Sequence, residues 1–176
     1  DPAIKEYIAS RTGPPYRGKV IRYLERPPHL CTDEAQAGEV YQYVAHELSL
    51  HDTTTVTYDM FVLLMCNAPM VTPEIIQQGI AMLRANASLD SAITVSKYNM
   101  WNPSRARYID ERALLRPMVV LPGATCDRDS CGDVYFADFG AVVVRPQCLD
   151  KLDGMGPQPW MGHRIYPIQQ DLPGFD

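Results

Sequence analysis

The feature that most constrains this fold is a run of seven apolar residues, 60–66 (MFVLLMC). The run is continuous rather than alternating, and it lies between Asp59 and Asn67. A strand with one face in water alternates apolar and polar side chains, whereas a strand of a parallel sheet is covered on both faces. The run therefore predicts a strand buried on both faces, with Cys66 as a small core residue.

The segments around this run predict a doubly wound α/β sheet. Thr72-Pro73 opens a helix with an apolar side, and residues 91–96 form a second β-rich run. A strand, a helix and a second strand in this order make a right-handed crossover unit. The other expected elements are helices over residues 1–13 and from Thr32 onward, a strand over residues 19–24, and short β runs at residues 107–109, 118–121, 141–144 and 164–168. We expect one domain over residues 1–176.

Charge and hydropathy exclude several classes of protein. The net charge of −5 argues against a protein that binds a nucleic-acid backbone, which requires clustered Lys and Arg. No apolar run approaches the roughly 20 residues of a membrane span, and no signal peptide is visible. The five cysteines have irregular spacings, and Cys126 and Cys131 lack a second pair with which to hold zinc. We expect a reduced, cytoplasmic protein without a membrane or nucleic-acid partner.

Ligands of open α/β sheets bind beyond the carboxyl ends of the strands. Asn67 follows the buried run and is a candidate site residue, although this segment alone favours the alternative that Asn67 and Pro69 simply form a turn. Arg26 follows another expected strand and suits a phosphate or carboxylate, with an exposed loop arginine as the alternative. Arg105 and Arg107 lie two positions apart and share a face if the chain is extended, which is a modest indication of an anion site.

Two aspartates are placed to meet a cation. Asp138 precedes the run at 141–144, and Asp176 is the last residue. Mg²⁺ requires few protein carboxylates when phosphate oxygens complete its shell, so either residue is a candidate ligand. A turn or capping role explains both residues equally well. The sequence contains no nucleophile elbow, Walker-type loop or Gly-x-Gly-x-x-Gly loop.

The order of these segments resembles the cytidylyltransferases that make CMP-activated sugar acids, the CMP-sialic acid and CMP-KDO synthetases. The resemblance covers most of the chain and rests on the order and spacing of short motifs. These are residues 1–13, Glu25-Arg26-Pro27-Pro28-His29-Leu30 with Thr32-Asp33, residues 58–69, residues 90–95, Asn102-Pro103, Gly140-Ala141 and Asp176.

The resemblance implies a Rossmann-like mixed sheet of the nucleotide-diphospho-sugar transferase type, built as a three-layer sandwich. It further implies Mg²⁺-assisted coupling of CTP to a sugar acid such as sialic acid, with release of pyrophosphate, in a homodimer. Carried over by position, Arg26 contacts the nucleotide, and Asn67 and Arg107 stand at the reacting groups. Trp160 would contact the sugar, and Asp176 and Asp138 would hold Mg²⁺. The apolar excursion at residues 105–135 is the candidate dimerisation surface.

The sequence departs from the family in three places. In the family a Gly-rich phosphate loop precedes the position of Asp1, and this loop is absent here. If Asp176 begins the family's Asp-x-Asp motif, the second Asp of that motif would follow Asp176. Asn67-Ala68 replaces the Thr-Ser or Asp-Glu of relatives. The alternatives are therefore a non-catalytic nucleotide- or sugar-binding relative and a glycosyltransferase of the same general fold.

Overall fold

The computed structural model describes residues 2–11, 21, 23–51 and 58–170, and it divides the chain into two compact units. The first unit covers residues 1–56 and the second covers residues 57–176. Each unit is considered by itself. The expectation of a single domain stays a prediction.

The described part of the first unit contains two α-helices and a 3₁₀ turn at Pro28–Leu30. Helix α1 (Pro2–Arg11) confirms the expected N-terminal helix, and helix α2 spans Ala37–His51. Thr32 is not the cap of α2, because the Ala35 N–H bonds to the Thr32 carbonyl in a separate turn.

Helix α2 instead begins beside Gln36, whose N–H donates to the Glu39 carboxylate at 3.0 Å. The strand expected at residues 19–24 falls partly outside the described residues. Of that segment, Ile21, Tyr23 and Leu24 have no strand structure.

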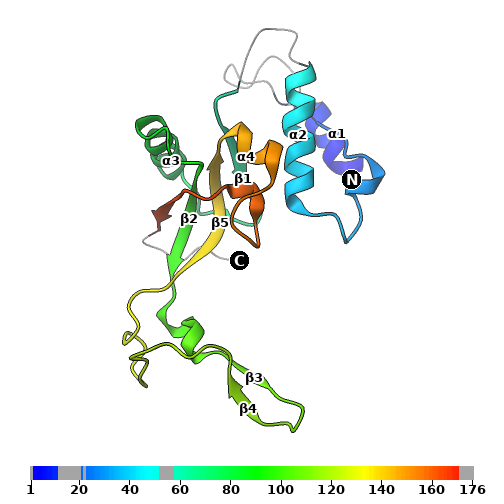
Figure 1. Ribbon diagram of the computed structural model, residues 1–176. Helices are drawn as coiled ribbons and strands as arrows, with labels where there is room; N and C mark the ends of the chain where they lie inside the picture. Colours follow the sequence, from blue (N-terminus) through cyan, green and yellow to red (C-terminus); the bar gives the residue numbers. More distant parts are fainter. Residues whose placement is uncertain (1, 12–20, 22, 52–57, 171–176) are drawn as a thin grey trace. The chain divides into compact units, whose positions relative to one another are not determined.

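The second unit contains a mixed four-stranded sheet with the order β1-β5-β2-β6 (Figure 1). Its strands are β1 (Phe61–Leu64), β2 (Ser91–Lys97), β5 (Tyr135–Val144) and β6 (Ile165–Gln169). Strand β5 is antiparallel to both of its neighbours, while β2 and β6 are parallel. The expected α/β class with a mixed sheet is confirmed, and the three-layer sandwich stays a prediction.

The apolar run at residues 60–66 is not the doubly buried strand that its composition suggests. In the described structure β1 pairs only with β5, and its side chains alternate between half-buried and exposed. Leu64 is 56% exposed, and Cys66 is exposed rather than part of the core. The doubly covered strand is β5, in which all residues from Ala141 to Val144 are 0% exposed. Strand β5 lies between two partner strands, and helix α3 packs over the sheet against Val143.

Helix α3 (Pro73–Ala85) packs on the sheet and forms its core. Thr72 occupies the N-cap position and Pro73 the first turn, as the sequence predicts. The packed cluster joins the helix to three strands through Leu83, Ala92, Val143 and Ile168. Gly79 permits this close approach, because a Cβ there would lie 2.8 Å from a Val143 methyl carbon. The chain thus confirms the expected strand–helix–strand unit, with β5 inserted between the two strands.

Residues 98–134, here called the arm, leave the sheet between β2 and β5 (Figure 1). The arm contains two 3₁₀ turns and a two-stranded hairpin of β3 (Arg107–Ile109) and β4 (Leu115–Pro117). The strand expected at residues 107–109 is confirmed, whereas the one expected at 118–121 lies earlier, at β4. Pairing with β3 decides this position, because Arg107 stands opposite Pro117.

A short helix, α4 (Pro146–Lys151), follows β5 and leads to the 3₁₀ turn Pro159–Met161. None of the described helices is long and apolar enough to cross a membrane.

Candidate functional site

The candidate site is organised by a bulge in β5. Ile93 pairs with Val142, but Val95 pairs with Ala137, so one residue of β2 faces several residues of β5. The extra residues of β5 are 138–140, and Phe139 has a φ of 54°. A bulky residue at positive φ is unfavourable and persists only where its surroundings hold it. Bulges of this kind re-aim side chains and are common beside active sites.

At the bulge, the buried hydroxyl of Thr94 takes the place of a backbone group in the hydrogen bonding between β2 and β5. It accepts from the Ala141 N–H at 3.1 Å and lies 3.4 Å from the Ala141 carbonyl oxygen. Gly140 completes the bulge, since a Cβ there would lie 2.9 Å from a methyl carbon of Val71. The absence of a side chain at Gly140 therefore lets β5 approach the loop that follows β1.

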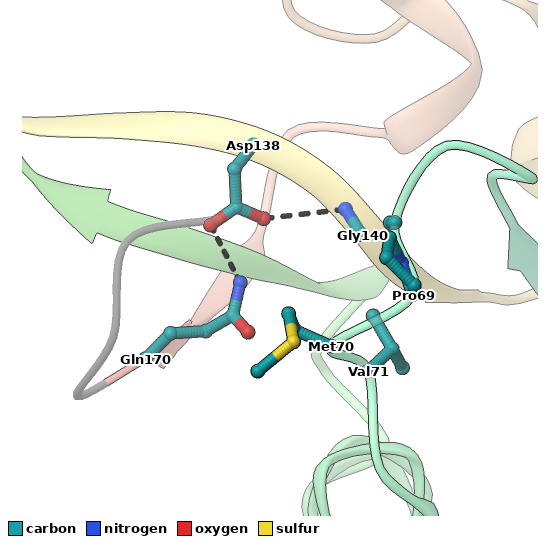
Figure 2. Close-up of a pocket in the computed structure, with 7 residues that line it drawn as sticks. Pro69, Met70, Val71, Asp138, Gly140 and Gln170 are labelled. Atoms are coloured by element: carbon teal, nitrogen blue, oxygen red, sulfur yellow. Dashed lines mark hydrogen bonds between the residues drawn. The ribbon is translucent and has the colours of Figure 1, made fainter. Parts of the chain in front are cut away.

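The bulge directs the Asp138 carboxylate toward three hydrogen-bond donors. One oxygen accepts from the Ser96 hydroxyl at 2.6 Å and from the Gln170 amide at 2.7 Å. The other accepts from the Gly140 N–H at 3.2 Å. Figure 2 shows Asp138 between Gln170 and the bulge. Because the donors come from β2, from β5 itself and from the residue after β6, the carboxylate is held in one orientation.

This carboxylate lines a small pocket at the carboxyl ends of β1 and β6. The lining residues are Ala68, Pro69, Met70, Val71, Asp138, Gly140 and Gln170 (Figure 2). The free volume of about 10 Å³ corresponds to a single water position. A nucleotide or sugar is far larger than this, so the pocket by itself can hold neither. Two of its lining residues, Asp138 and Gln170, carry polar side chains. We call it the Asp138 pocket.

The structure brings two of the sequence-predicted residues into this neighbourhood. Asn67 lies in the turn after β1, where its side chain is exposed, and the next residue, Ala68, lines the pocket with Asp138. The prediction that the loop after residue 66 lies at the carboxyl ends of the strands agrees with this position. The roles assigned to Asn67 and Asp138 stay predictions.

Arg107 is not part of the Asp138 pocket. Its guanidinium donates to the Ser104 and Ala106 carbonyls, both at 2.9 Å. It lines a separate cavity of about 540 Å³ in the arm, together with Arg105 and Thr125. The expectation that Arg105 and Arg107 share one site is consistent with this cavity.

The other candidates lie elsewhere. Trp160 is 3% exposed, and its ring centre lies 6.2 Å from that of Phe139, an arrangement that favours packing over sugar binding. Arg26 is exposed in the first unit, whose position relative to the pocket is not described. Asp176 lies outside the described residues.

The Asp138 pocket can supply one protein ligand to Mg²⁺. A carboxylate has about four lone-pair positions, and three at Asp138 accept the hydrogen bonds above. Mg²⁺ commonly takes one or two protein carboxylates and completes its shell with phosphate oxygens and water. Asp138 therefore fits as a single ligand, although the described part of the chain has no group of three His, Cys, Asp or Glu side chains that could hold a metal.

Sequence reasoning did not identify Ser96, Thr94 or Gln170. Ser96 and Thr94 are 1% and 0% exposed in β2, whose residues 91–96 are all buried. A buried hydroxyl requires a hydrogen-bond partner, so the hydroxyl residues of this expected strand were the available signal. Their partner, the β5 bulge, has no such signal in the sequence.

Comparisons with known proteins bear on the fold. No protein-family model and no curated protein matches this sequence. Among solved structures, the chain is similar to CMP:2-keto-3-deoxy-manno-octonic acid synthetase in complex with CTP, with a TM-score of 0.55 and 15% sequence identity. The match covers 100% of this chain and 72% of that chain. At this identity the likeness shows a shared α/β fold.

Proposed function

We propose that this protein is a cytidylyltransferase that couples CTP to a sugar acid and releases pyrophosphate. The observation that carries the proposal is the likeness of its fold to that of a synthetase solved with CTP. The Asp138 pocket supports it, because it lies beyond the carboxyl ends of strands, where α/β sheets bind ligands. The identity of the sugar acid is left to experiment.

In the proposed reaction the anomeric hydroxyl of the sugar acid attacks the α-phosphate of CTP. A bond forms between that oxygen and phosphorus, the bond to the β-phosphate oxygen breaks, and the hydroxyl proton passes to solvent. Such a transfer depends on positioning and charge neutralisation rather than on an enzyme nucleophile. Mg²⁺, when bound, would neutralise charge on the phosphate oxygens.

The proposal gives the chain's own residues distinct roles. Asn67, exposed beside the pocket, would orient a substrate by hydrogen bonds. Asp138 and Asp176 would be the protein ligands of Mg²⁺, and Arg26 would bind the nucleotide. Arg107, whose guanidinium has no carboxylate partner among the described residues, would bind an anionic group of the substrate.

The test is pyrophosphate release by the protein in its complete natural sequence, with CTP, Mg²⁺ and a panel of sugar acids. We expect turnover of at least one pairing. Asn67→Ala should lower kcat/KM by about tenfold or more, equivalent to about 1.4 kcal/mol of transition-state stabilisation. The matched control is Asn86→Ala at the end of α3, an exposed position away from the pocket. Equal activity of the two variants would remove Asn67 from the proposed site.

A non-catalytic binding module is the second candidate. Its specific support is that Asn67 provides an amide where the related enzymes carry other groups, and that Asp138 is the only carboxylate among the residues described as lining the pocket. This candidate predicts CTP binding by calorimetry without pyrophosphate release for any pairing. An absence of both binding and turnover would exclude both candidates, and consumption of a nucleotide sugar without pyrophosphate would indicate a glycosyltransferase.

A further inference from the structure

An open cavity of about 450 Å³ lies at the other end of β1 from the Asp138 pocket. The Asp138 pocket follows the end of β1, whereas this cavity borders its start, where Phe61 pairs with Val144. The lining comes from the residues before β1, the end of α3 and the start of α4, and it includes Tyr58, Asp59, Met60, Arg84, Arg145 and Gln147. A cavity of this size suits a small molecule. We call it the Arg84 cavity.

The Arg145 guanidinium is fixed in the wall of this cavity. Its Nε donates to the Leu89 carbonyl at 2.8 Å, and its Nη2 donates to the Leu83 carbonyl at 2.6 Å. Nη2 also lies 3.4 Å from the Asn86 carbonyl oxygen. A guanidinium carries five N–H donors, and the two on Nη1 have no hydrogen-bond partner among the described residues. The side chain is thus held in place by carbonyls at the end of α3 while two of its donors stay unused.

Arg84 supplies a second guanidinium to the same cavity. It is exposed in the last turn of α3, where a positive charge favours the negative end of the helix dipole. That interaction explains the charge but leaves the donors unused, because Arg84 has no hydrogen bond or ion pair among the described residues. Asp59 lines the cavity as well, and it has no ion-pair partner there either. The wall therefore holds two guanidinium groups that no protein carboxylate neutralises.

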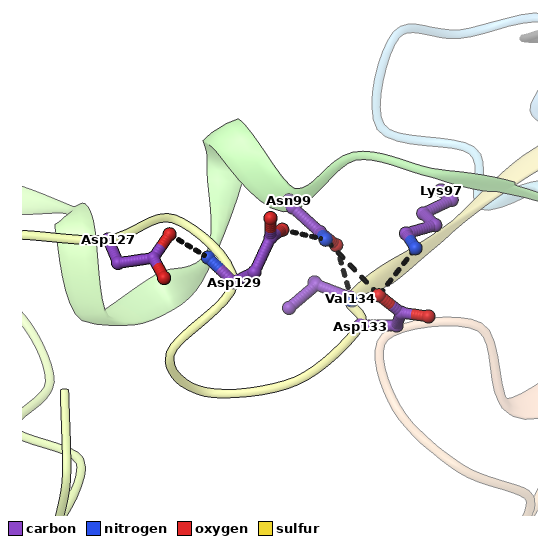
Figure 3. Close-up of polar contacts among 6 residues, drawn as sticks. All are labelled: Lys97, Asn99, Asp127, Asp129, Asp133 and Val134. Atoms are coloured by element: carbon purple, nitrogen blue, oxygen red, sulfur yellow. Dashed lines mark hydrogen bonds and ion pairs between the residues drawn. The ribbon is translucent and has the colours of Figure 1, made fainter. Parts of the chain in front are cut away.

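A cavity of similar size at the base of the arm, about 440 Å³, differs in this respect. Its polar side chains bind other protein groups. Lys97 forms an ion pair with Asp133, and the Asn99 amide donates to both Asp133 and Asp129 (Figure 3). A ligand at the base of the arm would have to displace these contacts, whereas a ligand in the Arg84 cavity would meet donors that are already free.

The free donors of the Arg84 cavity favour a tetrahedral oxyanion. A guanidinium offers parallel N–H groups to a pair of oxygens. A planar carboxylate has two oxygens, which one guanidinium satisfies, whereas the phosphate group of a monoester has three terminal oxygens and can accept from two guanidinium groups at once. The cavity is also larger than a phosphate group, and Tyr58 and Met60 line the remaining space. A phosphate attached to a small organic group therefore matches both the donors and the volume.

We propose that the Arg84 cavity binds the phosphate group of a small phosphate monoester. Arg84 and the Nη1 donors of Arg145 bind the phosphate oxygens, and the Gln147 side-chain amide supplies a further donor. Asp59 places one negative charge on the same wall and so limits the affinity for phosphate. The inference does not rest on the proposed cytidylyltransferase function, because this cavity and the Asp138 pocket lie at opposite ends of β1.

Chemical modification tests the position of the site. Phenylglyoxal modifies accessible guanidinium groups, and mass spectrometry of peptides gives the rate at each arginine. Glycerol phosphate should slow the modification of Arg84 in the complete natural protein and leave that of Arg112 unchanged. Arg112 is the matched control, because it is exposed between β3 and β4 and its side chain has no partner among the described residues. Acetate at the same ionic strength should protect Arg84 much less. No protection by glycerol phosphate, or equal protection by acetate, would overturn the proposal.

Calorimetry with glycerol phosphate tests the residues. Arg84→Gln should weaken binding about tenfold, as expected for the loss of a hydrogen bond between charged groups. Arg112→Gln changes the net charge equally and should leave the affinity unchanged. Asp59→Asn should strengthen binding about two- to fivefold, because it removes a like charge from the wall. Circular dichroism would show that the variants fold. Equal affinities of the two arginine variants, weaker binding by Asp59→Asn, or no binding by the wild type at about 10 mM contradicts the inference.

Discussion

The Ser96 hydroxyl donates a 2.6 Å hydrogen bond to the Asp138 carboxylate and so joins β2 to the bulge of β5. Ser96 is 1% exposed, so water cannot replace either partner easily. This one contact both orients the carboxylate of the Asp138 pocket and satisfies a buried hydroxyl.

Removing that hydroxyl should therefore cost stability. We expect Ser96→Ala to lower the free energy of unfolding by about 1–3 kcal/mol, the usual range when a hydrogen bond to a charged group is lost. Urea denaturation measures the change. Ser10→Ala is the control, since Ser10 makes a local hydrogen bond at an exposed position of α1 and should change stability by less than about 0.5 kcal/mol. A Ser96 variant as stable as the control would show that the contact is unimportant.

A side chain at Gly140 should disturb the same site. The added methyl group of Gly140→Ala would meet Val71 at 2.9 Å and force the loop after β1 to move. We expect a loss of about 1–3 kcal/mol, as for other overpacked positions. Gly156→Ala, where a Cβ would meet nothing within 4 Å, is the matched control for thermal denaturation. Equal melting temperatures for the two variants would contradict the close contact of Gly140 with Val71.

Asp90 should contribute stability that disappears in acid. Burial raises the pKa of its carboxyl, but hydrogen bonds from the Arg164 and His163 N–H groups and their charges lower it by more, so the net pKa lies below the ordinary 3.8. The depressed pKa means that Asp90 stabilises the fold above pH 3.8 and loses this contribution as the pH falls through its folded-state value. The stability difference between wild type and Asp90→Asn should shrink below pH 3.8.

Urea titrations at several pH values measure that difference. A difference for Asp90→Asn that stays constant down to pH 2 would show that the carboxylate charge is not what holds the 163–164 backbone.

The cysteines should differ sharply in reactivity. Burial raises the pKa of the Cys148 thiol to about 11, whereas Cys31, Cys66 and Cys126 are exposed. Thiolate is the reactive form, so alkylation at pH 8 should modify the exposed thiols well before Cys148. Mass spectrometry of timed digests gives the order. If Cys66 were as protected from alkylation as Cys148, that result would contradict its exposed position and support a buried strand at residues 60–66.

Local sequence patterns were sufficient for several elements. Thr72-Pro73 and the apolar periodicity that follows predicted α3, and residues 91–96 and 107–109 predicted strands that are present. These signals are local, because a cap, a helical repeat or a β-branched run acts within its own segment. The position of Asn67 beyond a strand end was predictable for the same reason.

Pairing partners were not predictable in this way. The run at residues 60–66 has the composition of a central strand, yet in the described structure β1 has a single partner and β5 is the covered strand. Composition reports how apolar a strand is, whereas burial depends on the strand's neighbours in the sheet and on what packs over its faces. Trp160 shows the same limit, since its packing against Phe139 depends on a distant bulge.

Local signals in the sequence specify the α/β character of this chain, the helix after Pro73 and the loop in which Asn67 lies. Tertiary contacts determine that β5 runs antiparallel through the sheet, that its bulge turns Asp138 toward Ser96 and Gln170, and that β3 pairs with β4. Capping and periodicity act over a few residues. Register and bulges, in contrast, arise from hydrogen bonds between strands far apart in the chain.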